Sequence, residues 1–317
     1  MKVERISPIP LDPKQAVAYA RIAAEEYGGC ETAKAHYLGG GSFGRAVGIT
    51  LTDGTALVVK LLRAPDMAEK EAHDLRLLRA HCPAPLPRVF FVRKADARIP
   101  ADCYGMQRIE GKSGLLSLRL LLQSEKKRRA FAEEVTAALH AIHGCTQDMF
   151  GDTIHPDCAE WTDYYGPFAE AVLRGAEQLT AQNKLDAGIP EAMRAAMRRF
   201  DTIFCERVPT ASLIHGDLNI ANIMVGKGGK LTGFIDPLNS LYADREYDLF
   251  QFNNLTGKRF YLCETYIRNY GASKHCIQKL AFYGLWNEVY CYIRSGVLVN
   301  LIMKPLVKNM RAQLEAL

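Results

Sequence analysis

Apolar and polar residues alternate over residues 35–62, a pattern typical of strands that are buried on one face. Within this stretch, AVGITLTDGTALVVKLL contains Asp53-Gly54, a dipeptide that favours a hairpin turn between two strands. Asp12 followed by Pro13 is a helix start signal, and Gly28-Gly29 is a stop signal. The same reasoning predicts helices over 12–27 and 66–81 and further strands over 88–93 and 104–109. The chain is therefore predicted to begin with a small antiparallel sheet and one inserted helix.

Apolar residues recur with helical spacing in most of the chain after residue 110. This spacing predicts helices over 125–143, 161–182, 190–206, 258–270 and 274–294, with a compact β/loop stretch over 212–236. The change of pattern falls near Glu110-Gly111-Lys112-Ser113-Gly114, which resembles a flexible joint. We therefore predict an α+β, bilobal protein with an N-terminal lobe over 1–109 and a helical C-terminal lobe over 110–317.

The composition of the 317 residues, 48% hydrophobic and 24% charged, is that of an ordinary globular protein. The net charge is only +5, and the one dense basic run, Lys126–Arg129, fits the solvated face of a helix, so we expect no nucleic-acid partner. Nine cysteines without a CxxC pair argue against zinc and favour a reducing compartment. The N-terminus has no signal-peptide pattern, and the apolar stretch 296–303 is too short to span a membrane, so we expect a cytoplasmic protein.

A glycine-rich segment, Gly39-Gly40-Gly41-Ser42-Phe43-Gly44, precedes the first strand of the predicted hairpin. Glycines allow backbone N–H groups to approach phosphate oxygens, and the members expected to do so are Gly39, Gly41, Ser42 and Gly44. Lys60 ends the apolar run 57–59, and Glu71 borders the buried face of the next helix. We predict that Lys60 contacts phosphate and that Glu71 orients it. The structural alternatives are a glycine hairpin, a solvent-facing lysine and a surface glutamate.

The most specific pattern is an apolar strand that runs into His215-Gly216-Asp217, with Asn222 five residues after the aspartate. A second apolar run, Leu231–Ile235, then leads to Asp236. Phosphoryl transfer from ATP requires a carboxylate that accepts the proton of the acceptor hydroxyl, and oxygen ligands that hold Mg²⁺ on the phosphates. Asp217, Asn222 and Asp236 fit these roles.

HGDLNIANIMV and GFIDPLNSLYADREYDL resemble the signatures of the aminoglycoside phosphotransferase and choline kinase-like superfamily, which has the protein-kinase fold. The resemblance implies that Asp217 is the catalytic base and that Asn222 and Asp236 bind Mg²⁺. It also implies that Lys60, paired with Glu71, contacts the phosphates of ATP. Backbone groups of a hinge containing Gln107 and Ile109 would meet adenine, and Asp248 would brace the catalytic loop.

Within the superfamily the chain most resembles fructosamine (ketosamine) kinases, through Asp236-Pro237, the stretch 242–249, Leu255-Thr256-Gly257 and Trp161 after Phe150-Gly151. It departs from that branch at Asn219, where a tryptophan is usual. Only 11 residues separate Asp236 from Asp248, too few for a peptide-docking segment, so a small-molecule hydroxyl is the expected acceptor. Acidic and aromatic groups suit an amine-bearing acceptor. The candidate wall residues are Trp161, Tyr165, Asp244 and Glu246.

Two other functions remain open from the sequence: an aminoglycoside or choline/ethanolamine-type kinase, and a nucleotide-binding module without transfer activity. The oligomeric state is open as well. His215 is expected to pack inside the catalytic loop, and His140 and His143 are not expected to bind a metal, because no further ligand lies near them in sequence. Trp286 and its aromatic neighbours recur at helical spacing and are predicted to be core residues.

Overall fold

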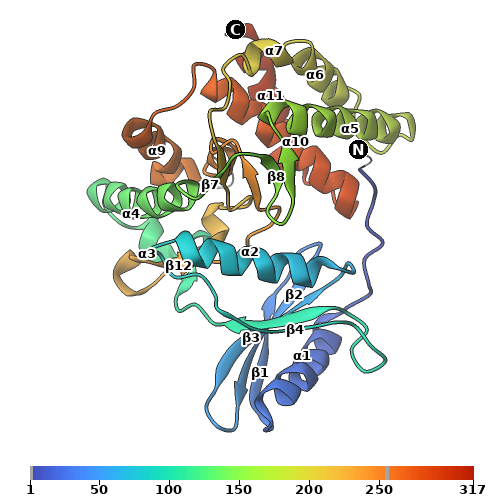
Figure 1. The fold of residues 1–317 in the computed structure, drawn as a ribbon, viewed down its shortest axis with the longest axis vertical. Helices are drawn as coiled ribbons and strands as arrows, with labels where there is room; N and C mark the ends of the chain where they lie inside the picture. The colour runs from blue at the N-terminus through green and yellow to red at the C-terminus, as the bar shows by residue number, and fades with distance from the viewer. Residues whose placement is uncertain (1–2, 254–256) are drawn as a thin grey trace.

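The computed structural model describes residues 3–253 and 257–317. Its N-terminal part is a five-stranded antiparallel sheet in the order β1-β2-β3-β5-β4, with one helix on either side (Figure 1). The strands are β1 (Thr32–Gly39), β2 (Gly44–Leu51), β3 (Ala56–Leu62), β4 (Val89–Arg93) and β5 (Cys103–Gln107), and the helices are α1 (Pro13–Gly28) and α2 (Met67–His81). This is the predicted small sheet with its inserted helix α2.

The predicted β2–β3 hairpin is confirmed, with Thr50 opposite Ala56 at its closed end. Gly54 adopts a φ of 89°, which a residue with a side chain rarely does. Asp53 accepts a hydrogen bond from the backbone N–H of Thr55 (2.8 Å). These two residues therefore set the turn that places Lys60 at the far end of β3.

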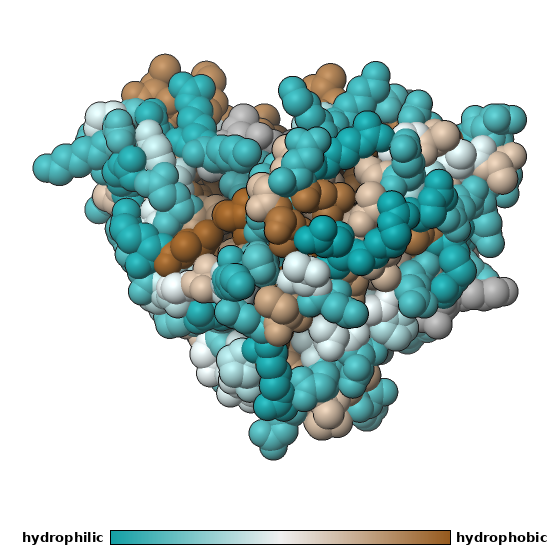
Figure 2. Space-filling view, turned by 90° about the horizontal axis from the view of Figure 1, so that it is seen from above, coloured by the Kyte–Doolittle hydropathy of each residue, from teal (hydrophilic) through white to brown (hydrophobic). Residues whose placement is uncertain are grey.

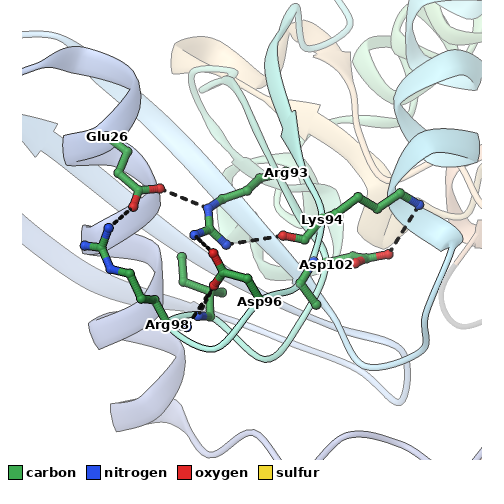
Figure 3. A network of polar contacts seen from close by, with 8 residues as sticks. Glu26, Arg93, Lys94, Asp96, Arg98 and Asp102 are labelled. Carbon is green, nitrogen blue, oxygen red and sulfur yellow. Dashed lines mark hydrogen bonds and ion pairs between the residues drawn. The ribbon is translucent and has the colours of Figure 1, made fainter.

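Helix α1 begins where the sequence indicates, because the Asp12 side chain accepts hydrogen bonds from the backbone N–H groups of Lys14 and Gln15. Its buried residues are all alanines, so the helix can approach the sheet closely. Glu26 fixes its C-terminal end by ion pairs to Arg93 (2.9 Å) at the end of β4 and to Arg98 (2.5 Å) on the β4–β5 connection (Figure 3). The helix thus covers one face of the sheet and is tied to its edge.

The C-terminal part consists of helices around two small sheets, with strand orders β7-β10-β13-β8-β9 and β12-β11-β6. Its helices are α3 (Leu118–Leu121), α4 (Glu125–His143), α5 (Trp161–Ala181), α6 (Gly188–Met197), α7 (Phe200–Ile203), α8 (Tyr247–Gln251), α9 (Leu262–Tyr270), α10 (Cys276–Ser295) and α11 (Asn300–Glu315). Its strands are β6 (Lys112–Ser113), β7 (Thr146–Gln147), β8 (Phe150–Asp152), β9 (Pro156–Cys158), β10 (Ala211–Leu213), β11 (Ile223–Val225), β12 (Leu231–Phe234) and β13 (Leu241–Ala243).

Two helical predictions need correction. The single helix predicted over 190–206 is two helices, α6 and α7, because Arg199 leaves helical geometry (φ −109°, ψ 13°). The change of direction lets Phe200 pack on Phe204, with ring centroids 4.5 Å apart, and both rings on Phe282. Helix α11 was not predicted, since Pro305 lies inside it and its exposed apolar residues obscure the helical pattern.

The apolar core forms two clusters. The boundary between these clusters does not coincide with the boundary between the sheet and the helical part. One cluster joins α1 to one face of the sheet. The other continues from α2 into the helical part and contains Trp286 and Phe282, which confirms their predicted core role. Helix α2 also contacts α4, and it lies between the sheet and the helical part (Figure 1). Side chains carried by α2 can therefore reach both halves of the molecule.

The face seen from the α11 end is mostly hydrophilic, with apolar side chains gathered in a band between the polar ones (Figure 2). The exposed large apolar residues near the start of α11 are Val297, Val299 and Leu301. Among the helices of the described residues, none has the length and apolar character required to cross a bilayer.

The tight turn at Gly216 allows the Asp217 segment to approach the chain that follows β12. Gly216 has a φ of 80°, and a Cβ added there would lie 2.2 Å from the carbonyl oxygen of Leu238. Gly228 has nearly the same φ, 78°, but a Cβ there would meet no atom within 4 Å. Substitutions at these two glycines therefore distinguish two effects. Both would suffer the cost of a left-handed backbone, but only the substitution at Gly216 would also cause a steric clash.

We predict that Gly228→Ala lowers the free energy of unfolding by about 1–2 kcal/mol, the cost of a left-handed alanine. Gly216→Ala is expected to lower it by about 1–3 kcal/mol more, because the backbone must also move. Chemical denaturation of both variants measures the difference. Equal losses would show that the close approach at Gly216 is absent.

Candidate active site

The ammonium group of Lys60 joins the two halves of the molecule. Its Nζ lies 2.6 Å from Oε2 of Glu71 on α2 and 2.5 Å from Oδ1 of Asp236, which follows β12. The structure thus brings together Lys60, Glu71 and Asp236, as the sequence predicted, although Asp236 lies 176 positions from Lys60. Tyr104 on β5 donates a further hydrogen bond to Glu71 (3.0 Å).

This ion cluster determines the charges at the site. Burial lowers the pKa of Lys60, but Asp236 and Glu71 outweigh it, so the pKa lies well above its usual range. Burial raises the pKa of Glu71. Burial also acts to raise the pKa of Asp236, yet the charge of Lys60 brings it below its usual value. The Asp236 side chain is 49% exposed, so a charged carboxylate faces the open space beside Lys60.

Three side-chain amides surround the carboxylate of Asp217. Asn222 donates from Nδ2 to Oδ2 (3.0 Å) and to the backbone oxygen of Asp217 (2.7 Å). Asn219 and Gln251 donate to Oδ1 at 3.0 and 2.9 Å. Burial raises the pKa of Asp217 to about 7, and the charge of Asp236 acts in the same direction. A fixed carboxylate with a pKa near neutrality is suited to accept a proton from a hydroxyl.

Gln251 was missed by the sequence analysis, and Asn219 was noted only as a departure from the ketosamine kinase branch. Gln251 lies three positions after Asp248 on α8, so the two side chains share one side of the helix. That spacing is the signal that could have identified Gln251. Asn219 also accepts a hydrogen bond from the backbone N–H of Ala221 (2.8 Å), which starts the short helical turn 220–222.

Asp248 holds the backbone of the Asp217 segment. Its two carboxylate oxygens accept hydrogen bonds from the N–H groups of His215 and Gly216, both at 2.8 Å. His143 lies 3.2 Å from Asp248 and 2.6 Å from the hydroxyl of Tyr266, so it belongs to the same buried network. Burial lowers the pKa of His215 to about 4, which keeps this imidazole neutral. These contacts agree with packing and bracing roles for His215 and Asp248.

The glycine-rich segment is a turn between β1 and β2, and two arginines bind its carbonyl groups. Arg45 donates to the oxygens of Gly41 (2.5 Å) and Gly44 (2.9 Å), and Arg63 donates to that of Ser42 (3.2 Å). A Cβ at Gly44 would lie 3.0 Å from Cε of Lys60, so this glycine keeps space beside the ammonium. The arginines thus fix the carbonyl groups of the turn, and its last glycine lies beside Lys60.

The remaining nucleotide-side residues lie at the junction of the two halves. Gln107 ends β5, is exposed, and donates its backbone N–H to the oxygen of Arg88 (2.8 Å). Ile109 follows as a buried residue. Both residues lie next to the end of β3 that pairs with Gln107. Their role as a hinge that contacts adenine remains a prediction.

The predicted acceptor-wall residues divide into two pairs. Trp161 and Tyr165, at the start of α5, line a cavity of about 370 Å³ that also includes Glu71 and the segment 238–241. Asp244 and Glu246 do not line this cavity. They are 3% exposed and form a buried cluster with Lys279, whose Nζ lies 2.5 Å from Asp244 and 2.7 Å from Glu246.

The expectation for Asp244 and Glu246 is therefore corrected. Asp244 also accepts a hydrogen bond from Tyr283 (2.8 Å), and Glu246 accepts one from Ser273 (2.7 Å). Their oxygens are occupied by internal partners, so the two carboxylates stabilise the packing of α8 against α10. Leu255 and Thr256, which contributed to the resemblance, lie outside the described residues.

A metal ion at this site would need ligands beyond the protein. No group of three or more His, Cys, Asp or Glu side chains is arranged to hold a metal in the part of the chain that the structure describes. Asn222 uses its amide nitrogen for Asp217, which leaves the amide oxygen as a ligand, and Asp236 has a charged carboxylate. Two oxygen ligands, completed by phosphate and water, are a set that suits Mg²⁺.

The family model for the phosphotransferase enzyme family matches residues 36–272. The chain belongs to this family. It is accordingly an enzyme, a small-molecule kinase, and the superfamily expected from its motifs is confirmed. A search of curated proteins by sequence found no match.

Solved structures of this superfamily share the fold over almost the whole chain. A candidate fructosamine-3-kinase from Thermobifida fusca has a TM-score of 0.67 at 20% identity, covering 93% of this chain and 98% of the other. A thermostable mutant of the aminoglycoside phosphotransferase APH(4)-Ia has a TM-score of 0.68 at 17% identity, with 93% and 98% covered. A candidate fructosamine-3-kinase from Haemophilus somnus has 0.65 at 15%, with 95% and 99% covered. The protein-kinase-like α+β fold is thereby confirmed.

We predict that Lys279→Met lowers the free energy of unfolding by about 3–5 kcal/mol, because Asp244 and Glu246 would be left buried without a counter-charge. The matched control is Arg174→Met, which removes an exposed cation paired with Glu170 at 3.4 Å and should cost less than about 1 kcal/mol. Denaturation with urea at neutral pH compares the two variants. Similar losses would show that Asp244 and Glu246 do not depend on Lys279, and both carboxylates would again be candidates for contact with the acceptor.

Proposed function

We propose that this enzyme transfers the γ-phosphoryl group of ATP, as its Mg²⁺ complex, to a hydroxyl group of a small amine-bearing metabolite such as a ketosamine. The observation that supports this most is the contact of Lys60 with Asp236 across the two halves of the molecule, 2.5 Å in length. The cation proposed to bind phosphate thus lies next to the carboxylate proposed to bind the metal. Asp217 and Asn222 are bonded to each other in the same region.

On the nucleotide side, residues 1–109 would form the binding lobe. Backbone N–H groups of Gly39, Gly41, Ser42 and Gly44 would contact phosphate oxygens, and Lys60, oriented by Glu71, would pair with the α- and β-phosphates. Backbone groups of Gln107 and Ile109 would bind the adenine. Two structural relatives support a nucleotide here: an APH(4)-Ia mutant solved with AMP-PNP and hygromycin B, and APH(2")-IIIa solved with GDP and kanamycin.

In the proposed reaction the acceptor oxygen attacks the γ-phosphorus while the bond to the β-phosphate oxygen breaks, so ADP leaves. Asp217 accepts the hydroxyl proton at its carboxylate, and the amides of Asn219, Asn222 and Gln251 hold that carboxylate in place. Bound Mg²⁺ would neutralise charge on the phosphates, with Asn222 and Asp236 as its protein ligands. The remaining barrier is lowered by alignment of the reactants.

The ketosamine is preferred as acceptor because the sequence resembles that branch at positions 242–249 and because two structural relatives are candidate fructosamine-3-kinases. The second candidate is an aminoglycoside, supported by the similarity to APH(4)-Ia. A nucleotide-binding module without transfer activity is disfavoured because the base, both oxygen ligands and the lysine are all present.

We expect ADP release from ATP in the presence of a panel of ketosamines, aminoglycosides, choline, ethanolamine and methylthioribose, assayed with a coupled enzyme system. Asp217→Asn should reduce the rate with the accepted substrate at least about 10³-fold, because the base is lost while the amide keeps the shape. ATP affinity, measured by calorimetry with Mg²⁺, should stay within about threefold.

The control variant is Asp201→Asn, which changes an exposed carboxylate on α7 and should keep the full rate. An undiminished rate in Asp217→Asn would contradict the assignment of the base. ATP binding by the wild-type protein without transfer to any acceptor would favour the non-catalytic alternative.

A further inference from the structure

The cavity beside the Asp217 region is lined by aromatic rings and by charged groups of both signs. Six rings contribute to its wall: Trp161, Tyr164, Tyr165, Phe168, Tyr247 and Tyr290. Tyr165 is only 2% exposed. Its buried hydroxyl nevertheless has no hydrogen-bond partner among the residues that the structure describes. A buried hydroxyl of this kind costs free energy unless a ligand or water satisfies it.

One side of the cavity carries a surplus negative charge. Lys70 on α2 donates to both carboxylate oxygens of Asp74, at 2.7 and 2.6 Å, and also to Thr153 (3.0 Å) and Ser240 (3.2 Å). Its distance to Asp152 is longer, 3.5 Å. The charge of Lys70 is thus used mainly by the buried Asp74. Asp152, at the end of β8, remains a 45% exposed carboxylate at the cavity wall.

Arg294, in the last turn of α10, also lines the cavity. Its guanidinium lies 5.7 Å from the ring centre of Tyr290, a contact that holds it over the aromatic face. It forms no ion pair with a carboxylate of residues 3–253 or 257–317. Its position at a helix C-terminus is favourable in itself, but a planar guanidinium on an aromatic wall is also suited to bind a carboxylate.

The cavity wall is linked to the proposed reaction centre by two hydrogen bonds. Tyr247 lies on α8 four residues before Gln251, which binds Asp217. Ser240 lines the cavity and donates from its hydroxyl to the backbone oxygen of His215 (3.0 Å), two residues before Asp217. These contacts link the cavity wall to the segment that carries Asp217, although Asp217 itself does not line the cavity.

We propose that this cavity binds a zwitterionic acceptor, with Arg294 binding its carboxylate and Asp152 its ammonium group, while the aromatic rings enclose its apolar part. The inference rests on the proposed function and narrows it. It selects a ketosamine formed from a free amino acid over aminoglycosides and choline, which have no carboxylate. The acceptor hydroxyl would then be placed by contacts at both of its charged ends.

The test uses the full-length enzyme and two acceptors that differ only in the carboxylate: fructosylvaline and fructosylvalinamide. For the wild-type protein we expect kcat/KM to be at least tenfold higher for the acid. In Arg294→Gln that preference should fall to less than threefold, and Arg294→Lys should restore part of it. Arg198→Gln, which removes an exposed arginine at the end of α6, should keep the wild-type preference.

Asp152→Asn gives a separate readout, because it should raise KM for the acid and the amide by the same factor. KM for ATP should not change in any of these variants, which separates acceptor binding from a general loss of structure. Equal kcat/KM for acid and amide in the wild type, or a preference that survives in Arg294→Gln, would overturn the inference.

Calorimetry with the same two compounds distinguishes the inference from the proposed function. Tighter binding of the acid without phosphate transfer would support the cavity assignment and contradict the proposed reaction. Phosphorylation of an aminoglycoside or choline, with no binding of either fructosyl compound, would overturn the zwitterion assignment and leave the transferase function in place.

Discussion

The site depends on one ammonium group shared between two carboxylates from different parts of the fold. Lys60 comes from the sheet, Glu71 from the helix between sheet and helical lobe, and Asp236 from the segment after β12. Removing charges from water costs free energy that is offset only when the charged groups lie close together. The three groups therefore stabilise the arrangement of the lobes that keeps them in contact. Because the carboxylates raise the pKa of Lys60, the cation stays charged and available to a phosphate group.

The Asp217 segment is held by hydrogen bonds from uncharged donors to carboxylates rather than by ion pairs. Asp248 binds two consecutive backbone N–H groups ahead of Asp217, and amides bind the Asp217 carboxylate itself. Two carboxylates that influence each other therefore have opposite pKa shifts: the pKa of Asp236 is lowered by Lys60, and that of Asp217 is raised by burial. Opposite shifts suit opposite tasks, a permanent anion for a metal and a proton acceptor near neutrality.

The sequence predicted those features that depend on spacing within short segments. Strand alternation located the β2–β3 hairpin, and the His-Gly-Asp pattern located Asp217 and Asn222. It did not predict the partner of Asp244 and Glu246, because Lys279 comes from a distant helix and only the fold brings it near. Gln251 was missed for the same reason, since its target lies 34 positions earlier in the chain. Long-range charge pairing therefore decided which acidic residues are structural.

The most direct test is a crystal structure of the enzyme with a non-hydrolysable ATP analogue and Mg²⁺. We expect that Lys60 keeps its contact with Glu71 and contacts the α- or β-phosphate, and that Asn222 and Asp236 bind a metal ion on the phosphates. We also expect that the oxygen of Asp217 faces the γ-phosphate without touching the metal. A nucleotide bound elsewhere, or a metal held without Asp236, would contradict this account.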